Sequence, residues 1–112
     1  MTYKKSKKLR GGASVEYGRR PIVLGRIDLE ESDFPPEWDR IHYREYFGLN
    51  IININFPDRI KIIESQAFMK CPNLENVEFS ENSNLEIIGS KAFYDCKNLQ
   101  MIILPPSLQH IG

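Results

Sequence analysis

The second half of the chain repeats itself with a period of 25 residues. Four residues, Ala67, Phe68, Cys71 and Leu74, recur in the same order and at the same distances as Ala92, Phe93, Cys96 and Leu99. A period in the twenties with apolar residues at fixed places is typical of a solenoid, in which each repeat forms one coil. Because each coil contacts only its neighbours, the pattern predicts a stacked array.

Three short extended segments mark the same place in successive coils. They are residues 54–56, 77–79 and 102–104, which we predict to be strands. Alternation along a strand directs every second side chain inward. The expected core residues are Ile51, Ile54, Phe56, Leu74, Val77, Phe79, Leu99, Ile102 and Leu104. The middle coil carries two additional residues in the polar run 80–84, which is typical of a surface turn.

The consensus of the repeat is I-x-x-x-A-F-x-x-C-x-x-L-x-x-I-x-I-P-x-x-[IL]-x-x-I. One copy comprises Ile63, Ala67, Phe68, Cys71, Leu74, Val77 and Phe79, and the next comprises Ile88, Ala92, Phe93, Cys96, Leu99, Ile102, Leu104, Pro105, Leu108 and Ile111. This pattern resembles the leucine-rich repeats of the Treponema type, also called BspA-like, over about residues 51–112. It departs from them at Ser80, where the pattern has proline, and in a last coil that stops before its Ala-Phe pair.

The resemblance implies an α/β solenoid that binds partners on its sheet face. On that face the side chains that alternate with the core residues point outward and form two ladders. We predict that the two ladders together make one partner-binding surface. The first ladder is Asn53, Asn76 and Met101, and the second is Asn55, Glu78 and Ile103. The surface changes from polar to apolar toward the C-terminus.

Residues 30–48 carry the start and stop signals of a helix. Ser32 or Asp33 is placed to cap it, Pro35-Pro36 follow in the first turn, and Gly48 supplies the stop. We expect this helix to cover the open apolar end of the array, since solenoids need a dissimilar terminal element. The alternative is that its aromatic residues anchor a partner. Those residues are Trp38, Tyr43 and Tyr46.

Charge is distributed unevenly along the chain. Residues 1–20 carry a net charge of +6 and the remainder −6. The basic residues of this arm are Lys4, Lys5, Lys7, Lys8, Arg10, Arg19 and Arg20. One interpretation is that the arm is a disordered tail that keeps the chain soluble or folds back onto its acidic body. The other is that the arm binds a polyanion, such as nucleic acid or an acidic cytoskeletal surface.

Residues 21–29 are expected to form an extended segment. This segment is either an edge strand of the array or an arm that lies on a partner.

The chain stops at Gly112 in mid-repeat. We expect this to leave a strand edge unpaired and to leave Leu108 and Ile111 without a coil stacked beyond them. Either the sequence is a fragment of a longer array, or another protein or a second copy of the chain continues the sheet. The predicted organisation is therefore a basic arm (residues 1–20), an extended segment with a capping helix (residues 21–49) and coils (residues 50–112).

Residues suited to catalysis are sparse. Cys71 and Cys96 occupy equivalent sites of adjacent coils, and we expect reduced core thiols, as the resemblance implies a buried cysteine ladder. Two cysteines without a nearby histidine make no zinc site. His42 and His110 have no neighbouring nucleophile, and the carboxylates are scattered over turns. We expect a non-enzymatic protein with no cofactor and no metal.

No run of eighteen apolar residues exists, and the basic start lacks the apolar segment of a secretory signal. We therefore expect an intracellular, cytoplasmic protein that does not span a membrane. The leading hypothesis is a structural or protein-interaction subunit of a larger assembly. The alternatives are a nucleic-acid or ribonucleoprotein-associated factor that uses the basic arm, and a surface adhesion module.

Overall fold

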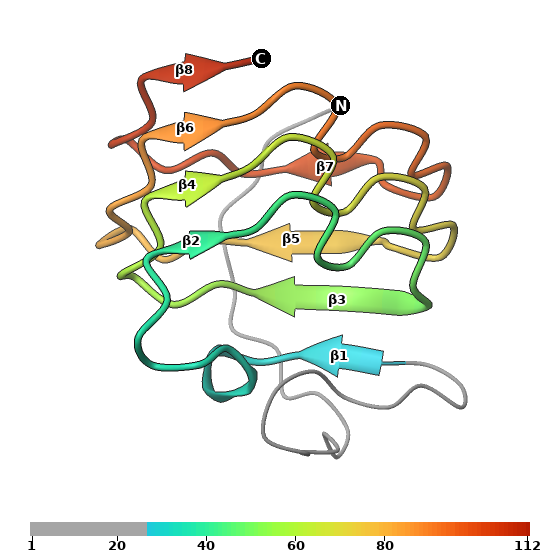
Figure 1. The fold of residues 1–112 in the computed structure, drawn as a ribbon, viewed down its shortest axis with the longest axis horizontal. Coiled ribbons are helices and arrows are strands. Elements are labelled where there is room, and N and C mark those ends of the chain that lie inside the picture. Colours follow the sequence, from blue (N-terminus) through green and yellow to red (C-terminus); the bar gives the residue numbers. More distant parts are fainter. Residues whose placement is uncertain (1–26) are drawn as a thin grey trace.

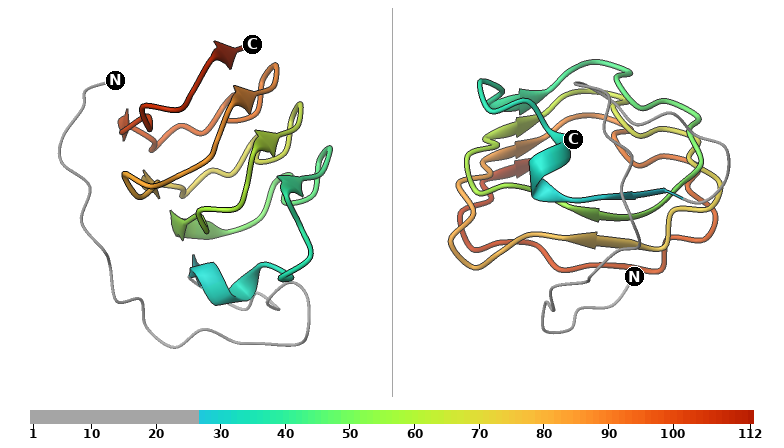
Figure 2. Two further views of the ribbon diagram at one scale, coloured as in Figure 1. Left: turned by 90° about the vertical axis from the view of Figure 1, so that its left-hand side faces the viewer. Right: turned by 90° about the horizontal axis from the view of Figure 1, so that it is seen from below.

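Each coil of the array contributes one strand to each of two facing parallel sheets. The computed structural model describes residues 27–112, which wind into four stacked coils (Figures 1 and 2). One sheet has the strand order β1-β3-β5-β7 and the other β2-β4-β6-β8. The elements are β1 (Ile27–Leu29), the 3-10 turn η1 (Glu31–Asp33), β2 (Arg40–Ile41), β3 (Ile51–Asn55), β4 (Ile62–Ile63), β5 (Asn76–Glu78), β6 (Ile87–Ile88), β7 (Met101–Ile102) and β8 (His110–Ile111).

The register between strands matches the sequence repeat. In the first sheet Ile54 lies opposite Val77, and Val77 lies opposite Ile102. In the second sheet Ile63 lies opposite Ile88. Equivalent residues of successive coils therefore stack along the axis, and the predicted solenoid is confirmed. The second sheet was not predicted, because its strands are only two residues long and show no alternation.

The core fills the space between the two sheets. Seven of the nine predicted core residues are buried, and Leu99 and Leu104 are partly buried against the same cluster. The second sheet adds Ile41 and Ile63, both fully buried, and Ile88, which is 5% exposed. Apolar burial between the sheets is the main force that holds the coils together.

Two stacks of aromatic rings run through this core along the solenoid axis. The first, with ring centroids 5.5 and 5.0 Å apart, joins Phe34, Phe56 and Phe79. The second, with centroids 5.1 and 5.5 Å apart, joins Tyr46, Phe68 and Phe93. The stacks touch where Phe68 meets Phe56 edge to face at 5.6 Å. Such pairs add about 0.5–1.5 kcal/mol each beyond the burial of their area.

The predicted helix over residues 30–48 is wrong. This stretch contains η1, strand β2 and irregular turns. Its backbone bonds across to the next coil, because the Tyr46 N–H donates to the Ala67 carbonyl and the Gly48 N–H to the Met69 carbonyl, both at 2.9 Å. A helix would use those groups for its own ladder. The described residues therefore form a β-solenoid without a capping helix, and this stretch belongs to its first coil.

Residues 30–48 form a coil and not a helix because of the spacing of their large apolar side chains. The first coil has Phe34, Pro35, Trp38 and Ile41 at the offsets of Leu104, Pro105, Leu108 and Ile111 in the last coil. Stacking that set on the second coil buries whole side chains, each worth about 1.5–3 kcal/mol. The helix caps that the sequence offers are worth only about 1 kcal/mol. Burial therefore overrides the capping signals.

The two additional residues of the middle coil lie in a surface turn, as predicted. Ser80, which stands where the repeat has proline, donates from Oγ to Asp58 Oδ1 at 2.6 Å and accepts from the Asn82 N–H at 2.9 Å. Asn84 donates to the Asp58 carbonyl from its backbone and its side chain, both at 3.0 Å. The turn is therefore fixed to the preceding coil by polar contacts in place of the rigid proline ring.

Strand β1 pairs with β3 and forms the first strand of its sheet, so the end of the predicted extended segment 21–29 is an edge strand. Residues 1–26 lie outside the described part of the chain. They include the predicted basic arm and the first part of the extended segment.

Gly89 is required by the close approach of neighbouring coils. A Cβ at this position would lie 2.6 Å from the Ser65 backbone nitrogen. We expect Gly89→Ala to lower the free energy of unfolding by about 1–3 kcal/mol, because the backbone must shift. Urea denaturation measures this loss.

The matched control for that substitution is Gly48→Lys. Gly48 has a φ of 72° and no atom within 4 Å of a Cβ, and the equivalent Lys70 and Asp95 hold φ values of 62° and 61°. We expect a loss of about 1 kcal/mol, the cost of holding a residue other than glycine at a positive φ. A larger effect at Gly48 than at Gly89 would contradict the stacking argument.

Candidate partner-binding surface

The outward face of the β1-β3-β5-β7 sheet carries a ladder of linked polar side chains. Asn53 Nδ2 donates to Asp28 Oδ1 at 2.7 Å, and Asn76 Nδ2 donates to Asn53 Oδ1 at 2.6 Å. In the next register position stands Met101, which offers no donor. The structure therefore brings together the first predicted ladder and extends it by Asp28 on β1.

The second predicted ladder lies beside the first. Asn55 stands opposite Glu78 in register and donates from Nδ2 to Glu30 Oε1 at 3.4 Å. Asn55 is 6% exposed, whereas Ile103, which follows β7, is half-buried. The rungs of this ladder thus pass from polar to apolar along the axis, as the sequence predicts. The face presents fixed, pre-oriented amide groups at one end and apolar side chains at the other.

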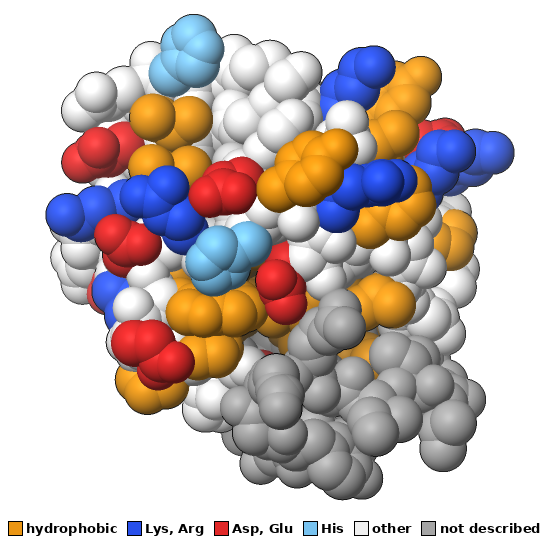
Figure 3. All heavy atoms as spheres, in the orientation of Figure 1, with side chains coloured by type: hydrophobic (Ala, Val, Ile, Leu, Met, Phe, Trp, Pro, Cys, Tyr) orange, Lys and Arg blue, Asp and Glu red, His pale blue; other side chains and the backbone are white. Residues whose placement is uncertain are grey.

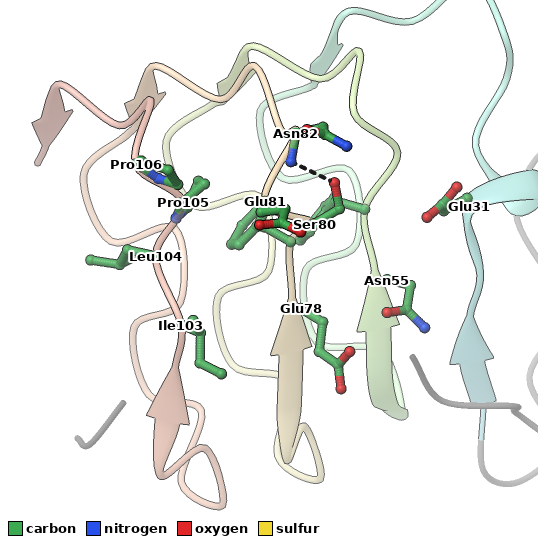
Figure 4. Close-up of a pocket in the computed structure, with 12 residues that line it drawn as sticks. Glu31, Asn55, Glu78, Ser80, Glu81, Asn82, Ile103, Leu104, Pro105 and Pro106 are labelled. Carbon is green, nitrogen blue, oxygen red and sulfur yellow. Dashed lines mark hydrogen bonds between the residues drawn. The ribbon is translucent and has the colours of Figure 1, made fainter. Parts of the chain in front are cut away.

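A hollow of about 490 Å³ lies at the end of this face, where the strands pass into their turns. Figure 4 shows the carboxylates of Glu31, Glu78 and Glu81 along it, with Ile103 and Leu104 on the far side. Its remaining lining residues are Asn55, Phe56, Phe79, Ser80, Asn82, Pro105 and Pro106. Acidic groups therefore occupy one wall and apolar side chains the other, and Lys and Arg are absent from the residues that line it.

The residues of the predicted aromatic helix lie in three different environments. Tyr46 is 1% exposed and belongs to the inner ring stack, so it offers no surface to a partner. Trp38 is partly buried against the core, with its ring centroid 4.7 Å from that of His42. Tyr43 is 56% exposed. Among the three, Tyr43 alone projects fully onto the surface.

The last coil holds the predicted open end. Leu108 is half-buried against the core, and Ile111 on β8 is 53% exposed. Within residues 27–112, β7 and β8 are each paired on one side only. The structure thus places both predicted residues at one end of the array. The basic arm residues Lys4, Lys5, Lys7, Lys8, Arg10, Arg19 and Arg20 lie outside the described residues.

Cys71 and Cys96 are buried free thiols. Each donates to a backbone carbonyl of the preceding coil, Cys71 Sγ to Tyr46 at 3.2 Å and Cys96 Sγ to Phe68 at 3.1 Å. The hydrogen bond with Cys96, together with burial, raises the pKa of the Cys71 thiol above its ordinary value. The Cys71 thiol is therefore protonated at neutral pH and is a poor nucleophile.

The raised pKa of Cys71 predicts that stability falls at alkaline pH. In the unfolded chain this thiol titrates at its ordinary pKa of 9.0, whereas the folded chain retains the proton. Above that pH the unfolded state binds fewer protons at Cys71, so this thiol decreases the free energy of unfolding by up to about 1.4 kcal/mol per pH unit. Below that pH the contribution of Cys71 is fully present. The same hydrogen bond lowers the pKa of Cys96 below 9.0, and this opposite shift adds stability as the pH rises toward 9.0, so the decrease is expected above that pH.

Urea denaturation between about pH 8 and pH 10.5 measures this dependence. The control is Cys71→Ala, which lowers stability at every pH because it leaves a cavity. The variant is expected to show a flatter decrease with pH than the parent chain. Equal slopes in the two proteins would contradict the assignment of the effect to this thiol.

Nothing in residues 27–112 brings three or more His, Cys, Asp or Glu side chains together in a way suited to metal binding. The same residues contain no helix with the length and apolar character needed to cross a bilayer. His42 lies 3.9 Å from Glu45, and His110 is exposed on β8.

Three acidic surface residues were missed from the sequence: Asp28 in the polar ladder, and Glu31 and Glu81 in the hollow. Asp28 and Glu31 belong to the first coil. The signal that identifies this coil is Phe34-Pro35 followed by Trp38 and Ile41, which repeats the offsets of the later coils.

Comparison with known proteins agrees with this geometry. A family model described as "BspA type Leucine rich repeat region (6 copies)" matches residues 25–112 of the chain. The match includes the first coil, ahead of residue 51, where the resemblance recognised in the sequence begins. No curated protein and no solved structure gives a significant match to the chain.

Proposed function

Because the chain belongs to the BspA-type leucine-rich repeat family, we propose that it is a protein-interaction unit that binds a partner through the outward face of the β1-β3-β5-β7 sheet. Solenoids expose extended binding surfaces built from equivalent positions of successive coils. Repeats of this family are generally non-enzymatic, and the proposal assigns the chain a binding and structural role.

The polar ladder Asp28-Asn53-Asn76 is the observation that carries the proposal. Its two side-chain hydrogen bonds, of 2.7 and 2.6 Å, hold the amide groups in fixed orientations before any partner arrives. A pre-organised surface loses less side-chain entropy on binding, which increases affinity. Beyond the ladder, toward the C-terminal end of the sheet, Met101 and Ile103 make the same face apolar. A complementary partner therefore carries polar groups opposite the ladder and apolar groups opposite Met101 and Ile103.

As part of a larger assembly, the chain contributes this face as its main contact. The basic arm of residues 1–20 supplies a second attachment to an anionic partner. The open end at Leu108 and Ile111 supplies a third, in which another strand pairs with the free edge of the sheet.

The test uses Ile103→Glu, which places a charge on the proposed surface. The tagged full chain is used to capture proteins from an extract of its source cells, and the captured proteins are quantified by mass spectrometry. We expect Ile103→Glu to reduce the capture of specific partners about tenfold, which corresponds to the loss of one apolar contact region.

The matched control is Ile87→Glu. Ile87 is also half-buried and lies in a strand, but on β6 of the opposite sheet. We expect this variant to capture the same proteins as the parent chain, with melting temperatures confirming that both variants fold. An equal loss of capture in the two variants, or no specific partner for the parent chain, would contradict the proposal.

A further inference from the structure

The hollow beside the sheet face extends over all four coils. Its lining residues belong to η1, to the ends of β3 and β5 with the turns that follow them, and to the segment after β7 (Figure 4). Neighbouring strands lie about 4.8 Å apart, so three such spacings give a length of roughly 14 Å. An extended peptide covers that length with about four or five residues, whereas one ion or one small group fills only part of it.

The hollow has a pronounced negative charge. Glu31, Glu78 and Glu81 line it. The seven Lys and Arg residues among residues 27–112 lie elsewhere, because none belongs to β1, β3, β5 or β7 and none lines the hollow (Figures 3 and 4). Arg59 is the nearest of them in sequence, and its guanidinium is directed to three backbone carbonyls of the first coil, at 2.6 to 3.0 Å. The hollow therefore attracts a cationic group.

Asn55 supplies a hydrogen-bond acceptor that faces the hollow. The residue is 6% exposed, and its Nδ2 donates to Glu30 Oε1 at 3.4 Å. Figure 4 shows its Oδ1 turned toward Glu78 and its Nδ2 turned away. Within residues 27–112 no donor reaches that oxygen. Because buried polar groups are normally hydrogen-bonded, a ligand that brings N–H donors to this oxygen is favoured.

The opposite wall of the hollow is apolar. Ile103 and Leu104 are half-buried, and Pro106 is exposed. The stacked rings of Phe56 and Phe79 also contribute to the lining. A side chain with an aliphatic stem and a charged end buries the stem on such a surface and keeps its charge among polar groups. The two walls together therefore suit a basic side chain better than a bare cation.

We propose that the hollow binds an arginine side chain from an extended segment of the partner, with an aliphatic residue two positions away against the apolar wall. This inference rests on the proposed function of the sheet face and specifies the chemistry of its partner. Arginine carries five N–H donors in a planar fork, so it pairs with carboxylates and an amide oxygen at once. In an extended segment, residues two positions apart point to the same side. The arginine therefore faces Asn55 and Glu78 while the aliphatic residue faces Ile103.

Other cations and anions match the hollow less well. A metal ion is held by several ligands that converge on one point, and the described residues contain no group of three acidic, Cys or His side chains arranged in that way. A lysine ammonium is a point charge with three donors, so it satisfies fewer of the acceptors than arginine does. The phosphates of a nucleic acid are repelled by the carboxylates.

Nuclear magnetic resonance of the isotope-labelled full chain tests the proposal. The probe is a synthetic peptide of about eight residues, long enough to cover the hollow, with the central sequence Arg-Gly-Leu. The matched peptide has citrulline in place of arginine, which keeps the shape and removes the charge. We expect saturable changes in the amide signals of Asn55, Glu78 and Ile103 with the arginine peptide, and weaker binding at about 200 mM salt than at about 50 mM. The citrulline peptide is expected to bind about tenfold more weakly.

Removal of the carboxylates locates the site. The double variant Glu78→Gln/Glu81→Gln is expected to bind the arginine peptide about tenfold more weakly than the parent chain. The matched control is Glu86→Gln/Asp95→Asn, which removes the same number of charges outside the hollow. It is expected to bind within about twofold of the parent chain, because exposed charges at a distance are screened. Circular dichroism confirms that both variants fold. Equal weakening in the two variants would show a general attraction to an acidic body and would overturn the proposal.

The basic arm needs its own control, because its side chains are also cationic. Replacing the seven Lys and Arg residues within residues 1–20 by Gln is expected to leave the affinity for the arginine peptide within about twofold. If the peptide binds only after this replacement, the arm itself occupies the hollow, and the proposal is overturned.

This inference and the proposed function fail separately. The aliphatic residue of the segment contacts Ile103, so Ile103→Glu is disruptive for a partner that carries arginine, as for any partner of the sheet face. If the arginine peptide does not bind, whereas Ile103→Glu still reduces capture from the extract, the sheet face binds a partner of another kind. In that case the arginine site alone is overturned.

Discussion

Replacing Phe68 by Ala is expected to lower the free energy of unfolding by about 3–5 kcal/mol. Phe68 is fully buried, stacks between Tyr46 and Phe93, and meets Phe56 edge to face at 5.6 Å. Its removal therefore interrupts one ring stack in the middle and separates it from the other. For a domain with a total stability of about 5–15 kcal/mol, this loss leaves a substantial unfolded population near 37 °C.

Urea denaturation followed by the fluorescence of Trp38 measures this loss. The control is Tyr94→Ala in the adjacent coil, where the ring is 55% exposed and contributes little packing. We expect its effect to stay within about 0.5 kcal/mol, as for other surface positions. Similar losses at the two sites would show that the ring stack does not hold the coils together.

Arg59→Met is expected to destabilise the first coil, with a loss of about 2–3 kcal/mol. The Arg59 guanidinium donates three hydrogen bonds to backbone carbonyls of the preceding coil, to Trp38 at 3.0 Å, Phe34 at 2.9 Å and Pro35 at 2.6 Å. Charged donors make the stronger hydrogen bonds, and methionine retains the aliphatic stem without them. The planar guanidinium reaches all three acceptors at once, so Arg59→Lys is expected to recover only part of the loss.

Hydrogen exchange of the first coil, together with urea denaturation, tests this role, because local opening should increase there first. The control is Arg40→Met. The Arg40 side chain is 41% exposed and forms ion pairs with Asp39 at 3.3 Å and Glu64 at 3.5 Å. Exposed pairs of this kind contribute about 0–1 kcal/mol. If Arg40→Met lowers the free energy of unfolding as much as Arg59→Met does, the three hydrogen bonds from Arg59 to the first coil are not the source of the effect.

The later coils were predictable because their signals are local and repeated. Ala-Phe, Cys and Leu return at fixed offsets, so the register from Phe56 onward follows from counting. The outward ladder of Asn53, Asn76 and Met101 follows from alternation along strands of known register. The hollow beside Ile103 did not follow, since it depends on how the turns after the strands lie against one another.

The first coil was mistaken because two kinds of local signal competed in the same residues. Caps and prolines in residues 30–48 favour a helix, while Phe34, Trp38 and Ile41 keep the spacing of a coil. Tyr46 stands where the later coils have Phe68 and Phe93, a substitution that hid the repeat.

The sequence by itself determined that equivalent residues stack, which of them face inward, and which outward side chains form ladders. These properties depend on period and alternation, which any reader of the chain can count. Only the tertiary structure decided that residues 30–48 join the stack and that Asp28 completes the polar ladder. Those outcomes depend on the free energy gained when segments far apart in sequence pack together, which exceeds the preferences of each segment alone.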